Sequence, residues 1–242
     1  MKKIIIANWK ANLPIRSSLV LAKKYSSLSQ KKFSIVVCPD FLGIQPISIL
    51  LKKTNISLGA QDSSIFSLGA HTGEIPSSAL KSLGVKFILV GHSERRSNGE
   101  TSEITFQKIQ RILAEKITPV ICIGENLIQH NQNKTIAVLK KQLFSIFSQL
   151  SKEEKERRIL IAYEPVWSIG SGKALDADEA GFVCRFIKEF ANQNSLSKVE
   201  VIYGGSVNES NSDNYLKEEN ISGLLLGGSS LNFPLFSKIV NS

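Results

Sequence analysis

The sequence predicts an α/β protein, a single closed (β/α)8 barrel over residues 1–242. Short runs rich in β-branched residues alternate with amphipathic segments along the chain, which is the pattern of repeated βα units around a parallel sheet. There are eight such runs, the number that suits a closed barrel of this kind. No GxGxxG sequence follows the first run, as it would in an open, doubly wound sheet that binds a dinucleotide.

The expected elements follow from these periodicities. We expect strands at residues 4–8, 34–38, 56–61, 87–91, 118–123, 160–163, 200–203 and 223–226. The clearest helices are expected at residues 17–28, 101–115, 135–150 and 178–192. Ser151 with Glu154, and Asp176 with Glu179, have the spacing of N-terminal capping pairs. No stretch rich in Pro, Gly or Ser divides the chain, so one domain is expected.

The composition argues against several classes of protein. The formal net charge is +9, but Lys and Arg are spread along helical segments, often beside acids, so no nucleic-acid interface is predicted. No apolar run approaches the roughly 20 residues that span a membrane, and no signal-peptide pattern follows Met1. We therefore expect a cytoplasmic protein with no membrane partner. Cys38, Cys122 and Cys184 lack CxxC spacing, which predicts buried thiols and neither a disulfide framework nor a zinc cluster.

The first candidate site group is Asn8-Trp9-Lys10, at the end of the first expected strand. In a (β/α)8 barrel the chemistry lies where the strands end, so polar residues directly after apolar runs are the candidates. Lys10 would place a positive charge in the mouth of the barrel. A lone lysine at such a position is more often a solvated end residue, and this motif alone leaves both interpretations open.

The second group is Gly-His-Ser-Glu-Arg-Arg at residues 91–96, directly after a strongly apolar run. The chain has three histidines, and His92 alone follows a well-defined expected strand. It is therefore a candidate for hydrogen bonding or proton transfer to a substrate. The alternative is a histidine that only satisfies structural hydrogen bonds.

The third group, residues 162–173, places Glu164 at the end of an expected strand and then a loop with Pro165 near its start and Gly170 and Gly172 near its end. An acid followed by such a loop is typical of a catalytic carboxylate under a mobile lid that excludes water. The alternative is a surface glutamate beside a turn.

The fourth group consists of glycine pairs after the last two expected strands, Gly204-Gly205-Ser206 and Gly227-Gly228-Ser229. Glycines let backbone N–H groups approach phosphate oxygens closely, and barrels often bind phosphate at these strands. Tight turns also need glycine, so a glycine pair by itself is weak evidence.

Taken in order, these motifs resemble those of the triosephosphate isomerase family. The resemblance covers residues 8–10, 91–96, 162–173, 203–207 and 223–231, and residues 69–74 are similar to the family's loop that inserts into a partner subunit. It implies a TIM barrel and an aldose–ketose isomerase that interconverts dihydroxyacetone phosphate and D-glyceraldehyde 3-phosphate in glycolysis and gluconeogenesis. It also implies a homodimer, with Thr72 near the neighbouring site, and no metal or organic cofactor.

The resemblance further implies a role for each candidate residue. Glu164 would move a proton between neighbouring carbons through an enediolate, and His92 would donate hydrogen bonds to the enediolate oxygens. Lys10 would hold positive charge near the substrate, which Asn8 would help to position. The phosphate would be bound by the backbone N–H groups around four residues: Gly170, Ser206, Gly227 and Gly228.

A few positions depart from the commonest family pattern. Ala11 stands where Met is usual, Asp62 where Asn is usual, and Ser168 and Ser171 where Ala and Thr are commoner in the lid. Residues 97–103 are about one residue shorter than in many relatives, next to the His92 motif.

Two rival functions can be compared with this one. A different phosphate-binding barrel enzyme, such as a sugar-phosphate epimerase or a Schiff-base aldolase, would want a metal cluster or a lysine in an apolar pocket. The sequence has no cluster with metal-ligand spacing, and Lys10 next to Asn8 is a poor candidate for that lysine. A non-catalytic binding protein that kept the fold is disfavoured by the presence together of Lys10, His92 and Glu164.

Overall fold

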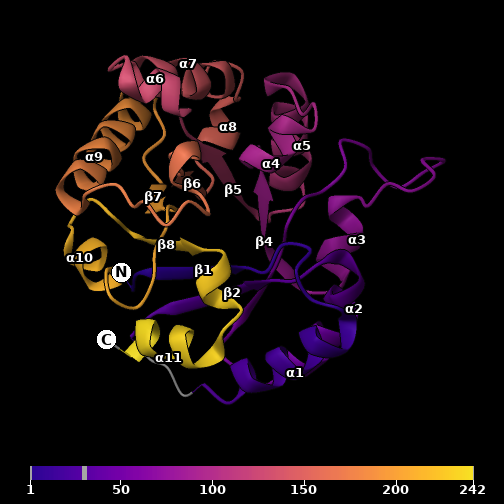
Figure 1. Cartoon of the computed structure of the whole chain (residues 1–242). Coiled ribbons are helices and arrows are strands. Elements are labelled where there is room, and N and C mark those ends of the chain that lie inside the picture. Colours follow the sequence, from indigo (N-terminus) through magenta and orange to yellow (C-terminus); the bar gives the residue numbers. More distant parts are fainter. Residues whose placement is uncertain (1, 29–31, 242) are drawn as a thin grey trace.

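The computed structural model describes residues 2–28 and 32–241. Eight parallel strands close into a barrel in the order of the sequence, with helices around it (Figure 1). The strands are β1 (Ile4–Asn8), β2 (Ser34–Cys38), β3 (Ser57–Ala60), β4 (Val85–Val90), β5 (Thr118–Ile123), β6 (Ile159–Tyr163), β7 (Val199–Tyr203) and β8 (Gly223–Leu226). The predicted (β/α)8 barrel is confirmed.

The helices cover the outside of the barrel and its connections. The longer ones are α1 (Ile15–Ser26), α2 (Phe41–Leu51), α5 (Ser102–Ala114), α7 (Thr135–Phe147), α9 (Ala177–Gln193) and α11 (Phe233–Asn241). The shorter ones are α3 (Ser77–Ser82), α4 (Ser93–Ser97), α6 (Leu127–Asn131), α8 (Lys152–Lys155) and α10 (Ser212–Lys217), with 3-10 turns η1 (Val166–Ser168) and η2 (Gly228–Ser230). None of the helices in the described residues combines the length and apolar character that crossing a membrane requires.

The expected element boundaries agree with the structure to within a few residues. Four strands have the predicted bounds, and the other four differ by one or two residues at an end. The helix predicted at 17–28 begins earlier, at Ile15, because Pro14 precedes it as the N-cap. Ser151 and Glu154 form the predicted capping box. Asp176 also caps its helix, but it does so by accepting from the backbone N–H of Asp178 at 2.9 Å.

The strands are buried on both faces, so the hydrophobic core has two layers, one inside the barrel and one between the strands and the helices. Inside the barrel, Ile4 and Ile6 of β1 pack with inward-facing residues of the other strands, such as Leu89. The alternate residues Ile5 and Ala7 pack outward against the helices. Such two-sided burial explains why the strands are continuous apolar runs with no polar alternation. The three cysteines are buried and unpaired, as predicted.

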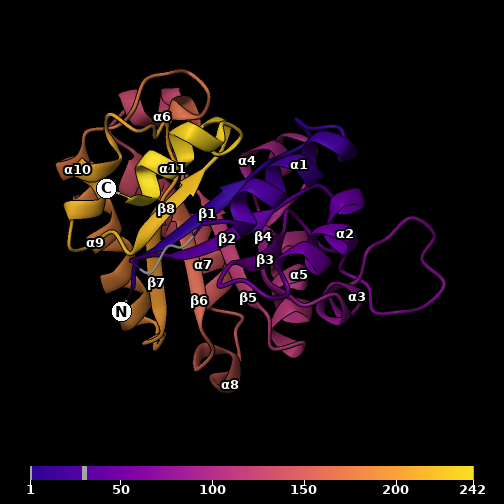
Figure 2. The same ribbon diagram turned by 90° about the horizontal axis from the view of Figure 1, so that it is seen from below.

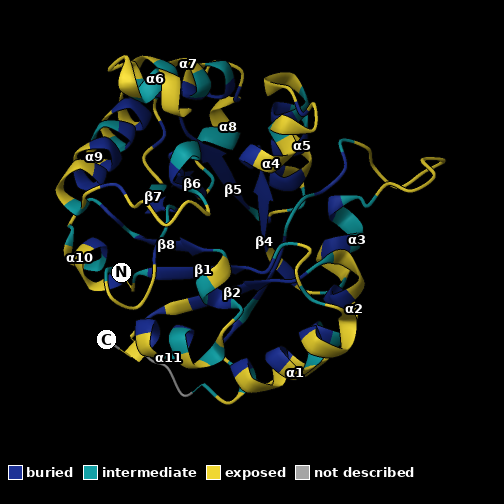
Figure 3. Ribbon diagram, in the orientation of Figure 1, coloured by how far each residue is buried: buried dark blue, intermediate teal, exposed yellow. Residues whose placement is uncertain are grey.

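The β3–α3 connection is the most prominent excursion from the barrel. It projects away from the other elements (Figure 2), and residues 66–74 are exposed along their whole length (Figure 3). This is the segment that resembles a partner-binding loop. The loops after β1, β4, β6, β7 and β8, by contrast, line the cavity described next.

Candidate active site

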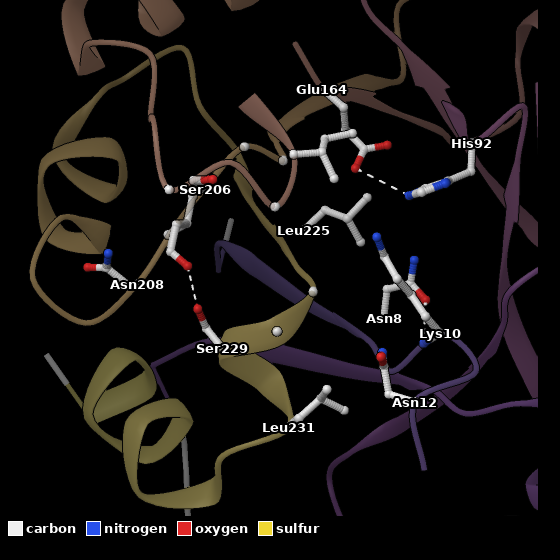
Figure 4. Close-up of a pocket in the computed structure, with 18 residues that line it drawn as sticks. Asn8, Lys10, Asn12, His92, Glu164, Ser206, Asn208, Leu225, Ser229 and Leu231 are labelled. Carbon is white, nitrogen blue, oxygen red and sulfur yellow. Dashed lines mark hydrogen bonds and ion pairs between the residues drawn. The ribbon is translucent and has the colours of Figure 1, made fainter. Parts of the chain in front are cut away.

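The carboxyl ends of the strands surround a cavity of about 370 Å³. The structure brings all eight residues selected from the sequence to its wall: Asn8, Lys10, His92, Glu164, Gly170, Ser206, Gly227 and Gly228. Figure 4 shows the side chains of Lys10, His92 and Glu164 directed into the same space. Charged and polar groups from five different strand ends therefore converge on one small volume.

Glu164 and His92 face each other across this cavity. Glu164 directly follows β6, and His92 follows β4 and is the N-cap of α4. Both side chains are about nineteen-twentieths buried, and Oε1 of Glu164 lies 3.6 Å from Nε2 of His92. The Oε2 atom of Glu164 is also buried and has no recorded hydrogen-bond partner among the described residues. Oε1 is therefore the carboxylate oxygen that lies beside the imidazole.

A backbone hydrogen bond to Nδ1 sets the orientation of the His92 ring. Its Nδ1 accepts the backbone N–H of Glu94 at 3.2 Å. Because an imidazole nitrogen that accepts is unprotonated, the ring proton of the neutral form lies on Nε2, which faces the cavity. His92 is therefore arranged as a hydrogen-bond donor to whatever occupies the space beside Glu164.

The peptide preceding His92 is held on both sides. Gly91 has φ of +66°, a conformation that favours glycine, and its N–H donates to Oε1 of Glu100 at 3.0 Å. The Arg96 guanidinium donates to the carbonyl oxygens of Gly91 and Cys122, the latter at 2.7 Å. His92 therefore starts from a fixed backbone position.

A buried ion cluster supports this arrangement. The ammonium of Lys108 contacts Glu100 at 2.5 Å and Asp62 at 2.7 Å, and Arg95 contacts Asp62 at 2.9 Å. Burial raises the pKa of Asp62, although Lys108 and Arg95 act to lower it. Burial acts to raise the pKa of Glu100 too, but the hydrogen bond and charge of Lys108, with Thr105 and Gly91, bring it below its ordinary value. The cluster joins the segment after His92 to the base of the β3–α3 connection.

Lys10 has a left-handed backbone, with φ of +52°. This conformation is uncommon for a residue with a side chain, so neighbouring groups must hold it. Its N–H donates to Oδ1 of Asn8 at 3.1 Å, and its carbonyl accepts from Nε2 of Gln61 at 2.9 Å. The same Gln61 nitrogen donates to the carbonyl of Cys38 at 3.1 Å, which ties the Lys10 loop to β2.

The Lys10 side chain has one recorded charged partner in the described part of the chain. Its Nζ lies 2.6 Å from Oε1 of Glu94, whose side chain is 55% exposed. An exposed pair of this type is weak, of the order of 0–1 kcal/mol. An anion in the cavity can therefore compete with Glu94 for the lysine.

The lid after Glu164 contacts the β7 loop. Ser168 is buried, and its Oγ donates to the carbonyl of Lys173 at 2.7 Å and accepts from the backbone N–H of Ser206 at 3.2 Å. The predicted phosphate-binding N–H of Ser206 is thus occupied by Ser168 in this lid position. Gly170 and Gly172 have φ of +67° and +74°, which places two conformationally free residues in the far half of the lid.

The β8 turn faces open space. A Cβ added to Gly228 would meet no heavy atom within 4 Å, and one added to Gly227 would come no nearer than 3.7 Å, to Cε of Lys10. Packing within the protein therefore does not require small residues here. Space beside the backbone is what close approach of a phosphate needs.

Sequence reasoning missed three residues that shape the site. Gln61 and Asn12 hold the Lys10 loop, Asn12 by donating to the carbonyl of Trp9 at 2.8 Å, and Leu225 lines the cavity beside Glu164. Gln61 and Asn12 are polar residues close to strand ends, the signal that selected Asn8. Leu225 gave no signal, because an apolar residue in an expected strand looks like core. Among the described residues, no group of three or more His, Cys, Asp and Glu side chains is placed to hold a metal ion.

Known proteins that are similar to this chain in sequence share one name. A sequence profile described as "Triosephosphate isomerase" matches residues 3–242. A triosephosphate isomerase of Endomicrobium trichonymphae is 38% identical over 245 residues, covering 99% of this chain and 98% of the relative. One of Clostridium botulinum (strain Loch Maree / Type A3) is 37% identical, covering 98% of each, and one of Mycoplasmopsis pulmonis is 38% identical, covering 99% and 98%. The chain belongs to the triosephosphate isomerase family.

Proposed function

We propose that this chain interconverts dihydroxyacetone phosphate and D-glyceraldehyde 3-phosphate, with Glu164 as the base and His92 as the hydrogen-bond donor. The observation that carries the proposal is the 3.6 Å approach of the Glu164 carboxylate to Nε2 of His92 inside a cavity that Lys10 also lines. A carboxylate beside a donor is what proton transfer next to a carbonyl requires. Family membership makes the chain an isomerase, and the geometry supports these roles.

The reaction moves one proton between two carbons. The Glu164 carboxylate removes a proton from the carbon that bears the hydroxyl, while the Nε2–H of His92 hydrogen bonds to the neighbouring carbonyl oxygen. The resulting enediolate has negative charge on oxygen, which His92 stabilises where it develops. Glu164 then returns its proton to the former carbonyl carbon, and the hydroxyl proton passes from the first oxygen to the second. No atom is gained or lost, and Glu164 ends ionised as it began.

Lys10 and Asn8 supply the fixed charge and the positioning. The side chain of Lys10 is 22% exposed and lines the cavity, where its ammonium offsets the charge of the phosphate and the enediolate. Asn8 is buried and accepts the N–H of Lys10, so it fixes the loop from which the ammonium projects. With this charge and the His92 donor in place, we assign no metal or organic cofactor to the reaction.

The phosphate occupies the side of the cavity formed by the glycine-rich turns. Gly227 and Gly228 have open space beside their backbone, and the lid brings Gly170 to the same cavity. The Ser206 N–H now donates to Ser168, so phosphate binding there exchanges one oxygen acceptor for another. In the lid position of this structure, Gly170 and its neighbours cover the enediolate and exclude water from it.

The direct test is turnover of D-glyceraldehyde 3-phosphate by the purified protein after treatment with a chelator. We expect activity that survives the chelator and is lost in Glu164→Gln, which keeps the side chain's size but removes the basic carboxylate. A wild-type protein that is folded by circular dichroism yet inactive would contradict the proposal and favour a binding protein that kept the fold.

We also propose that the chain forms a homodimer through the β3–α3 connection. Two groups of exposed apolar side chains lie on this side of the molecule, Phe41 and Leu42 at the start of α2 and Phe66 and Leu68 in the connection. Phe41 and Phe66 line one surface pocket, and Leu42 and Leu68, in the same two segments, are 80% and 73% exposed, which makes this an exposed apolar surface. Sedimentation velocity should detect dimers, and Leu68→Asp should yield monomers, whereas Val20→Asp on α1 should not.

We propose that residues 1–242 act as one domain, that the small phosphorylated triose is the substrate, and that neither nucleic acid nor membrane is a partner. A cytoplasmic location and a place in glycolysis and gluconeogenesis are the setting in which this substrate pair is used. Fractionation of cells that produce the protein, followed by the isomerase assay on each fraction, tests the location.

A further inference from the structure

The first turn of the lid is held by a side-chain cluster behind the active site. Trp167 lies in η1, three residues after Glu164, and its Nε1–H donates to Oε1 of Glu125 at 3.1 Å. The backbone carbonyl of Glu125 also accepts from the N–H of Val166 at 2.9 Å. Glu125 therefore holds the start of the lid with both its side chain and its main chain.

His130 of α6 contacts both members of this pair. Its ring centroid lies 4.5 Å from that of Trp167, and its Nδ1 lies 3.7 Å from Oε1 of Glu125, the oxygen that accepts from the indole. The His130 side chain is 29% exposed, so a proton from water can reach it, whereas the Glu125 side chain is completely buried. The three side chains form what we call the hinge cluster: Glu125, His130 and Trp167.

The Glu125 carboxylate has few partners for a buried acid. Tyr163 of β6 donates to Oε1 at 3.3 Å, and Oε2 has no recorded partner among the described residues. Burial raises the pKa of this carboxyl, against the opposing effects of the Trp167 hydrogen bond, the backbone, His130 and Tyr163. Within the described residues, the Glu125 carboxylate is a buried acceptor with no positively charged group bonded to it. A positive charge on the neighbouring, partly exposed His130 would therefore stabilise its ionised form.

The other titratable groups around the cluster do not supply that charge. Burial raises the pKa of Tyr163 and of the neighbouring Tyr203, and it raises the pKa of Cys184 to about 12. All three groups are therefore neutral. Lys134, the N-cap of α7, is the next cation along the chain; its N–H donates to the carbonyl of Gln129, and its carbonyl accepts from the N–H of Val138. His130 is the group placed to change the charge beside Glu125.

We propose that His130 is a positioning residue for the lid, and that protonation of its ring strengthens the hold of Glu125 on Trp167. An imidazolium would pair with Oε1 of Glu125, keep that carboxyl ionised as an acceptor, and lie as a cation against the indole face. All three effects stabilise the lid position in which Glu164 lies beside His92. The hold of Glu125 on Trp167 therefore differs between the charged and the neutral form of the ring.

This inference rests on the proposed isomerase function for its kinetic consequence. When only a fraction of the protein has the lid correctly placed, the apparent substrate affinity falls by that fraction. The KM of His130→Gln should therefore exceed that of the wild type by about threefold at pH 5.5 and approach it at pH 8.5, with kcat changed less. His130→Arg, which is charged throughout, should keep the low KM across the range.

The substrate phosphate also titrates, and this affects the KM of every variant equally. Dividing the KM of each variant by that of the wild type at the same pH cancels the effect. Asn131→Gln is the matched control, because Asn131 is an exposed neighbour on the same short helix. Its profile should follow the wild type. Parallel KM profiles for the wild type and His130→Gln would overturn the proposal.

Tryptophan fluorescence tests the hinge without turnover. An imidazolium in contact with an indole quenches its emission, so the wild-type emission should fall as the pH is lowered through the histidine range. The transition should be absent in His130→Gln, since Trp9, the second tryptophan, packs against Tyr25 in the core. If the protein proves not to be an isomerase, this measurement still decides the hinge: identical titrations of the two proteins overturn the proposal.

Discussion

The carboxylate of Glu164 lies 3.6 Å from Nε2 of His92, although one side chain follows β6 and the other follows β4. The two backbones are fixed separately. The N–H of Glu164 donates to the carbonyl of Ile123 at 2.8 Å, and Glu100 accepts the N–H of Gly91. The separation between Glu164 and His92 is therefore set by the barrel and by the groups that hold these two backbone segments.

Shortening the base should reduce chemistry more than binding. Glu164→Asp keeps the charge but withdraws the carboxylate by one methylene, away from the reacting carbon. A misplacement of this size costs of the order of 100-fold, so kcat should fall by about that factor while KM changes little. Steady-state kinetics, with circular dichroism as the control for folding, would refute this if kcat stayed near the wild-type value.

His92 should contribute mainly to the transition state. His92→Asn retains a polar side chain, but its amide is too short to place a donor where Nε2 now lies, so the developing enediolate loses its partner. Removal of one such donor typically costs about 100- to 1,000-fold in kcat. A change confined to KM would mean that His92 binds the substrate without assisting the reaction.

Loss of the Lys10 side-chain charge should reduce kcat/KM far more than loss of the Glu94 charge. Lys10→Met removes the cavity's positive charge and should lower kcat/KM by at least about 100-fold, since charge-assisted contacts to a substrate anion are among the strongest in a site. Glu94→Gln removes only an exposed partner, so its effect should be about threefold or less. Equal losses in the two variants would show that the ion pair itself is essential.

Alanine substitutions at two glycines of the site should change different kinetic constants, kcat at Gly204 and KM at Gly228. A Cβ on Gly204 would lie 2.8 Å from Cγ of Glu164, so Gly204→Ala should displace the base and lower kcat. A Cβ on Gly228 would meet nothing in the protein, so Gly228→Ala should leave thermal stability unchanged and raise KM by crowding the phosphate. Similar kinetic changes in both variants would contradict the assignment of these turns.

The buried Asp62 should make stability depend on pH in a defined direction. Its folded-state pKa is raised, mainly by burial, so the folded protein binds this proton more tightly than the unfolded chain does. That contribution to stability is complete below the ordinary carboxyl range and is lost as the pH rises through the raised folded-state value. Asp62→Asn removes the titration, so the Tm of Asp62→Asn minus that of the wild type should increase from acid to neutral pH. Each kcal/mol corresponds to about 2–4 °C for a chain of this size, and a constant difference would refute the prediction.

The sequence was sufficient for the strands, because a run buried on both faces must be continuously apolar. It was also sufficient for most of the site, because Asn8, His92 and Glu164 are polar residues placed directly after such runs, and strand ends gather on one face of a barrel. The sequence was less informative about boundaries. Residues 135–150 keep a helical pattern to the end, but the helix stops at Phe147.

Only the tertiary structure decided which groups support the site residues. Gln61 donates to the carbonyl of Lys10, and Glu100 accepts the N–H of Gly91, and no local sequence pattern pairs these residues. The contact of His130 with Trp167 and Glu125 likewise joins α6, η1 and the loop between β5 and α6. Local pattern reports whether a residue faces core or solvent, whereas these contacts depend on closing the barrel, which brings together the ends of strands far apart in the chain.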